Sequence, residues 1–110
     1  MNEILKYKTA TGKIPIDEWL CSLKDSMAKK QALIRIRRLS LGLEGDRKSV
    51  GDQVMELRIP LGKGYRVYYT WVGSSVVLLL AGGNKATQSK DIEKAKQYRR
   101  DYRERNLRNL

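Results

Sequence analysis

The spacing of apolar residues changes along the chain, and these changes divide it into helices and strands. Residues 3–8 are expected to form a short first strand. A helix is expected to begin at Pro15, whose missing N–H is not needed in a first turn, and Trp19, Leu20 and Leu23 then form one apolar face. A second helix is predicted from about Met27 to Leu41, with Ser26 as its N-cap. Its apolar positions recur at helical spacing and should face the core: Ala32, Leu33, Ile36, Leu39 and Leu43.

The middle of the chain has the two-residue period of β-strands. Apolar and polar residues alternate in 54–59 and again in 65–72, whereas 76–81 is continuously apolar. A continuous run of this length is typical of a strand that is covered on both faces. Glycine-rich turns separate the three segments, so they are predicted to form a three-stranded antiparallel meander.

A final helix follows the sequence Gly-Gly-Asn-Lys at 82–85. Thr87 or Ser89 is expected to cap it, and its apolar side should hold Ile92, Ala95, Tyr98 and Tyr102. A basic tail begins at about residue 99. The predicted fold class is α+β: a single domain over 1–110, with a twisted antiparallel sheet (a short N-terminal strand plus the meander), two N-terminal helices and one C-terminal helix.

The net charge changes this picture most. Lysine and arginine number 23 against 12 acidic residues, which gives a formal charge of +11. A small domain with this imbalance attracts nucleic acid, the ribosome, an anionic membrane or an acidic protein. No apolar run approaches the roughly 18 residues of a membrane span, and the N-terminus has no signal-peptide pattern. With one cysteine, Cys21, and so no internal disulfide, a cytoplasmic protein with no membrane partner is expected.

The chain has no histidine, so the commonest general acid or base near pH 7 is absent. The single cysteine and the scattered acids offer no ligand set with zinc spacing. We therefore expect no metal and no cofactor. Any chemistry must use Lys, Arg, Tyr, Asp or Glu.

Three segments resemble one family of bacterial toxins. They are Glu-Leu-Arg-Ile (56–59) followed by Gly-Tyr-Arg-Val-Tyr-Tyr (64–69), the block from Leu78 to Ile92 that contains Gly-Gly-Asn-Lys-Ala-Thr-Gln, and the early Ile-Pro-Ile-Asp-Glu-Trp-Leu (14–20). These segments are similar to the RelE/ParE superfamily, in particular its HigB-like, phage Gp49-like group of addiction module killer proteins. The resemblance spans about residues 3–102.

The resemblance implies a twisted antiparallel sheet with two N-terminal helices on one side. It also implies the toxin of a type II toxin–antitoxin pair, in many members a ribosome-dependent endoribonuclease that cuts mRNA. A cognate antitoxin, often a helix-turn-helix protein, neutralises such toxins, and the complex commonly binds operator DNA. Two alternatives remain open: a ParE-like inhibitor of DNA gyrase, and a catalytically inactive binding module that acts with its antitoxin as a co-repressor.

Metal-free RNA cleavage depends on positive charge at the scissile phosphate, and three residues are candidates for the catalytic site. Arg66 can bind a phosphate in bidentate fashion, and the resemblance implies a phosphate-binding arginine in the Gly-Tyr-Arg pattern; the alternative is a surface arginine paired with Glu56. Lys85 precedes a helix N-terminus, a position that favours anions, or it is a solvated loop lysine. Arg58 is expected to meet Arg66 across the hairpin as a second phosphate ligand.

Four further residues are candidates for RNA binding. Tyr68 stacks on a base or belongs to the packing of the sheet. Gln88 and the nearby Asp91 either orient groups at the site or are ordinary residues at the start of a helix. Arg99 and Arg100 in the basic tail bind RNA or operator DNA, meet the antitoxin, or form a solvated helix end. Some relatives place a histidine or tyrosine near the C-terminus as the acid or base; this chain has no histidine, so the general base is left open.

Overall fold

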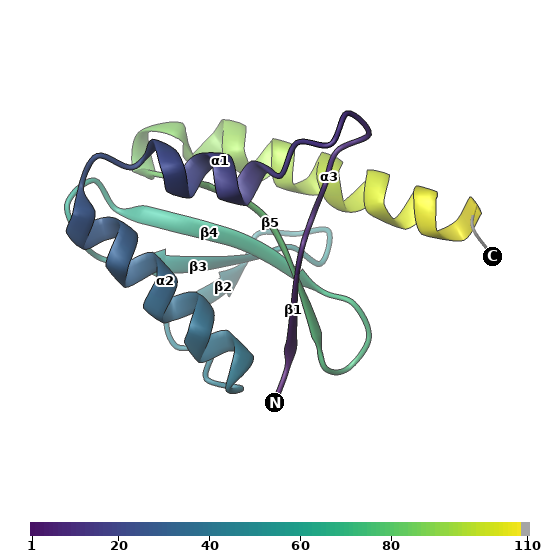
Figure 1. The fold of residues 1–110 in the computed structure, drawn as a ribbon, viewed down its shortest axis with the longest axis horizontal. Coiled ribbons are helices and arrows are strands. Elements are labelled where there is room, and N and C mark those ends of the chain that lie inside the picture. Colours follow the sequence, from purple (N-terminus) through teal and green to yellow (C-terminus); the bar gives the residue numbers. More distant parts are fainter. Residues whose placement is uncertain (109–110) are drawn as a thin grey trace.

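A five-stranded sheet forms the centre of the protein in the computed structural model, which describes residues 1–108 (Figure 1). The strands lie in the order β1-β5-β4-β3-β2. Their bounds are β1 Glu3–Lys6, β2 Arg47–Ser49, β3 Met55–Ile59, β4 Tyr65–Trp71 and β5 Val76–Gly83. The helices are α1 Pro15–Ser22, α2 Ser26–Ser40 and α3 Gln88–Arg108, and a short 3₁₀ helix, η1 Lys85–Thr87, precedes α3.

The predicted α+β class is confirmed, with two differences in the sheet. β1 pairs parallel with β5, so the sheet is mixed and not wholly antiparallel. The chain between them includes α1 and α2, and a connection of that length allows a strand to return in the parallel direction. β2 was not predicted, because its three residues are all exposed and show no apolar alternation.

The β3–β4–β5 meander is antiparallel as expected. Its side chains alternate between two cores, one on each face of the sheet. Tyr65, Val67 and Tyr69 belong to the core under α1 and α2, whereas Tyr68 and Leu80 belong to the core under α3. The prediction that 76–81 is covered on both faces is therefore confirmed.

The two N-terminal helices begin close to their expected positions. α1 starts at Pro15. α2 starts at Ser26 and not at Met27, and its N-cap is Asp25, whose carboxylate accepts hydrogen bonds from the backbone N–H groups of Met27 and Ala28. The expectation that Leu33 and Leu43 are core residues is wrong, because they are 47% and 59% exposed. The buried side of α2 is instead built on Ala28, Ala32 and Leu39.

The chain after β5 turns on Asn84. The Asn84 side chain accepts hydrogen bonds from the N–H groups of Ala86 and Thr87, and the Thr87 side chain closes a capping box around η1. The helical segment is therefore capped at Asn84, ahead of the predicted Thr87 or Ser89. Ala95, Tyr98 and Tyr102 pack α3 against the sheet as expected. No helix in residues 1–108 has both the length and the apolar character that a membrane span requires.

Candidate functional site

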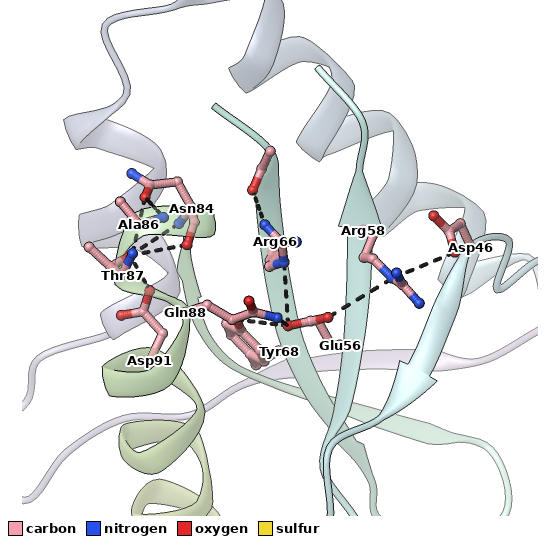
Figure 2. Close-up of polar contacts among 11 residues, drawn as sticks. Asp46, Glu56, Arg58, Arg66, Tyr68, Asn84, Ala86, Thr87, Gln88 and Asp91 are labelled. Atoms are coloured by element: carbon pink, nitrogen blue, oxygen red, sulfur yellow. Dashed lines mark hydrogen bonds and ion pairs between the residues drawn. The ribbon is translucent and has the colours of Figure 1, made fainter. Parts of the chain in front are cut away.

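Arg58 and Arg66 are directly opposite each other on β3 and β4. Cross-strand partners project to the same face with their Cβ atoms about 4.5–5.5 Å apart, so the predicted meeting of the two arginines is confirmed. A carboxylate lies between them (Figure 2). Oε2 of Glu56 is 3.4 Å from Nε of Arg66, and Oε1 is 4.0 Å from Nε of Arg58. Glu56 thereby offsets the repulsion of two neighbouring cations.

Glu56 is the centre of a buried polar cluster. Its side chain has no exposed surface. Tyr68 donates a hydrogen bond to Oε2 at 3.1 Å, and Gln88, the first residue of α3, donates to the same oxygen at 2.7 Å. Burial, reinforced by the Glu56 charge, raises the pKa of Tyr68 far above its ordinary value, so this phenol stays protonated and acts as a donor. The cluster joins β3, β4 and α3.

Arg66 leaves this cluster toward the turn between β3 and β4. Its side chain is 12% exposed, and Nη1 donates a hydrogen bond to the carbonyl of Gly64. Gly64 has φ +70°, and a Cβ placed on it would lie 3.1 Å from Nη1 of Arg66 and 3.5 Å from Cβ of Lys85. The glycine therefore allows Arg66 and Lys85 to approach each other. Lys85 is exposed, and its N–H is bonded to the carbonyl of Lys63.

A groove of about 700 Å³ lies beside these cations, at the point where β4 begins and β5 ends. One wall comes from α1 and the segment after it, and the other comes from the chain around η1 and the start of α3. Trp19 forms part of the first wall and packs against Gly82, where an added Cβ would be 2.2 Å from the indole ring. The lining residues that bear on function are Trp19, Lys24, Lys63, Tyr65, Asn84 and Asp91.

Asp91 places a carboxylate in this groove from the first turn of α3. Its Oδ2 accepts a hydrogen bond from the Thr87 hydroxyl at 2.5 Å (Figure 2). The carboxylate lies over Gly83, where an added Cβ would be 1.7 Å from Oδ2. Burial raises the pKa of Asp91, against the opposing effects of the Thr87 hydrogen bond and of nearby lysines.

The structure brings the predicted site residues Arg58 and Arg66 to one carboxylate, Glu56, to which Gln88 also donates a hydrogen bond. Lys85 lies outside this cluster, with its Cβ beside Gly64, the glycine whose carbonyl Arg66 reaches. The expectation that Tyr68 stacks on a base is wrong, because its side chain is fully buried and its phenol is bound to Glu56. Packing, the alternative, is what the structure shows. The pairing of Arg66 with Glu56 is also present.

Arg99 and Arg100 lie outside this cluster. They follow Gln88 by eleven and twelve residues of α3, a rise of about 16–18 Å along the helix axis. Arg99 donates a hydrogen bond to the Gln53 side chain, and burial together with Arg103 lowers its pKa. Arg100 is exposed. Any contact that these two arginines make with RNA is therefore separate from the site around Arg66.

Sequence reasoning overlooked the role of Glu56 at the centre of the site and the groove with Lys63 in its wall. The role of Glu56 had one signal in the sequence: the two-residue period of the strand places Glu56 and Arg58 on the same face. The groove had no signal in the sequence, because it depends on where α1 and the start of α3 lie around the end of β5. Within residues 1–108, no three His, Cys, Asp or Glu side chains are grouped so that they could hold a metal ion.

Comparison with known proteins supplies one informative relative. No protein-family model matches the chain. A protein of Haemophilus influenzae (strain ATCC 51907 / DSM 11121 / KW20 / Rd), described as "Uncharacterized protein", is 49% identical over 83 residues, which cover 76% of this chain and 84% of the relative.

Proposed function

The chain belongs to the same family as this Haemophilus influenzae protein, and we propose that it is the toxin of a type II toxin–antitoxin system. In this proposal it is a metal-independent, ribosome-dependent endoribonuclease that cuts mRNA and so inhibits translation in the cytoplasm. A cognate antitoxin, of the helix-turn-helix type, neutralises it, and the complex of the two binds operator DNA. The resemblance of the Gly-Tyr-Arg and Gly-Gly-Asn-Lys segments to RelE/ParE toxins supports this reading.

The single observation that carries the proposal is that Arg66, through Nη1, and Lys85, through its Cβ, both lie against Gly64 beside a groove. A phosphodiester bound there meets a guanidinium that is already oriented by Glu56 and Gly64. Fixed positive charge of this kind stabilises the phosphorane formed during RNA cleavage without reorganisation during the reaction. The net charge of +11 draws the polyanion to the surface.

The groove supports the same activity. Trp19 and Tyr65 supply aromatic surface, and Lys24 and Lys63 supply positive charge. Aromatic side chains and cations together are the usual means of holding a single strand of RNA. The groove therefore suits the nucleotides next to a phosphate held by Arg66 and Lys85.

One observation favours the alternative of a binding module without catalysis. Arg66 is 12% exposed and already bound to Glu56 and to the Gly64 carbonyl. An arginine held in this way stabilises the sheet whether or not RNA is bound. Under this alternative, the exposed cations bind nucleic acid, and no bond is broken.

Induced expression in bacteria separates these readings when growth, protein synthesis and transcript 5′ ends are followed together. We expect growth arrest, loss of protein synthesis and new mRNA 5′ ends. Arrest with intact transcripts and a DNA-damage response would instead indicate a gyrase inhibitor, and normal growth would indicate the binding module.

The variants that test the site are Lys85→Ala and, as a matched control, Lys13→Ala. Both lysines are exposed, so both changes remove one charge without opening the core. Only Lys85→Ala is expected to restore growth. Equal toxicity of the two variants would contradict the placement of the site at Lys85.

A further inference from the structure

Cleavage of RNA by its own 2′-hydroxyl requires a group that accepts the hydroxyl proton. The chain has no histidine, so carboxylates and tyrosines are the natural candidates. Tyr68 is excluded because it is fully buried and its raised pKa keeps it protonated as a donor to Glu56. Glu56 is also fully buried, with both oxygens turned toward the arginines. It orients Arg66 and cannot reach a substrate.

Asp91 differs from Glu56 because it lines the groove. Gly83 is the cross-strand partner of Arg66, so the two residues project to the same face of the sheet. The carboxylate of Asp91 fills the space where a side chain of Gly83 would lie, so it lies over the residue directly opposite Arg66 in the sheet.

The local contacts of Asp91 fix its orientation while leaving one oxygen available. Thr87 donates a hydrogen bond to Oδ2. None of residues 1–108 donates a hydrogen bond to Oδ1. A carboxylate that is held at one oxygen, lines the groove and lies over the cross-strand partner of Arg66 is arranged to accept a proton.

We infer that Asp91 accepts the proton of the attacking 2′-hydroxyl, with the ribose of the cleaved nucleotide bound in the groove. This inference rests on the nuclease activity proposed above. The bond between O2′ and phosphorus forms as the O2′ proton passes to Asp91, and the bond between phosphorus and O5′ breaks. The leaving O5′ takes a proton from the Lys85 ammonium. The products are a 2′,3′-cyclic phosphate and a 5′-hydroxyl, and Asp91 returns its proton to Lys85 through solvent.

Burial makes this carboxylate a stronger base than an exposed aspartate, because its raised pKa brings it nearer to neutral pH. The Thr87 hydrogen bond and the charges of Lys94 and Lys90 limit this rise of the pKa. The charged and titratable groups around it are Lys90 and Lys94 on α3, Arg66 and Tyr68 on β4, Lys63 after β3, Lys85 in η1, and Lys24 and Asp25 between α1 and α2.

The test is single-turnover cleavage of an mRNA bound to ribosomes by the purified protein, across a range of pH. The wild-type rate is expected to rise with pH as Asp91 loses its proton. Asp91→Asn is expected to cleave about 10²–10⁴-fold more slowly and to lose this pH dependence. Its Kd for an RNA with a 2′-deoxy residue at the cleaved position should stay unchanged. Glu93→Gln, an exposed change on the same helix, is the control and should behave as wild type.

The outcomes separate the two proposals. Cleavage by Asp91→Asn at the wild-type rate would overturn this inference and leave the nuclease standing, whereas no cleavage by the wild type would overturn both. If Asp91→Asn does not fold, Asp91→Glu carries the test: we expect partial activity with a shifted pH profile, and an unchanged profile would overturn the inference.

Discussion

The carboxylate of Asp91 occupies the space above Gly83, so close that an added Cβ would be 1.7 Å from Oδ2. Helix α3 and strand β5 are thereby joined at the groove by one pair of residues. A change at either position is expected to affect the other.

Gly83→Ala is predicted to lower the free energy of unfolding by about 1–3 kcal/mol, because the new methyl group forces Asp91 away from its position. Urea denaturation of the purified chain measures this effect. The double variant Gly83→Ala with Asp91→Ala removes the clash, so it should be more stable than the sum of the two single changes predicts. Strict additivity would show that the two side chains do not compete for this space.

Glu56→Ala is predicted to cost about 3–5 kcal/mol of stability, because it leaves the largely buried Arg66 without its counter-charge. Glu56→Gln keeps the size of the side chain and loses the charge, so its cost should be smaller. Thermal or chemical unfolding gives both values. Glu93→Ala on the exposed side of α3 is the control, with an expected change within about 0.5 kcal/mol. A Glu56→Ala variant as stable as this control would contradict the central role of Glu56.

The stability of the protein is predicted to depend on pH through Tyr7, which lies away from the candidate site. Burial, together with a hydrogen bond from its hydroxyl to Asp101, raises the pKa of Tyr7 from 10.0 to about 12. A group whose pKa is raised by folding contributes its full stabilisation at pH values below its pKa in the unfolded chain. This contribution is lost as the pH rises toward its pKa in the folded protein. The stability difference between wild type and Tyr7→Phe should therefore shrink from about pH 10 to about pH 12. A constant difference would show that Tyr7 does not titrate in this way.

Binding of single-stranded RNA is predicted to weaken steeply with salt. The logarithm of the association constant should fall by about 0.7 per unit of log salt for each contacted phosphate. Lys85→Ala should reduce this slope by about 0.7, and Lys13→Ala should leave it unchanged. Fluorescence anisotropy with a labelled RNA measures the slopes. A flat response in the wild type would contradict an electrostatic interface.

Much of the fold was predictable because its signals are local. The alternation in 65–72 places Tyr65 and Val67 on one side and Arg66 and Tyr68 on the other, and the structure has this arrangement. The parallel pairing of β1 was not predictable in this way, since strand direction depends on where the intervening helices return the chain. β2 has no apolar period at all.

The site was predictable only in part, for the same physical reason. Period 2 places Arg58 and Arg66 on one face, and the turn between the strands sets them opposite each other. Lys85 and Arg66 both lie beside Gly64, because the β3–β4 turn packs against the segment after β5. No spacing in the sequence reveals this contact. The sequence left Tyr68 open between base stacking and packing, because a tyrosine suits both; the packing of α3 on this face of the sheet decides for burial.

Cleavage of a defined mRNA on purified ribosomes is the most direct test of the proposed nuclease. The account predicts that the wild-type chain cuts the mRNA only when ribosomes are present. It also predicts that Lys85→Ala cuts about 10²–10³-fold more slowly, while Lys13→Ala cuts at the wild-type rate. An mRNA that stays intact with the wild-type chain and active ribosomes would contradict it.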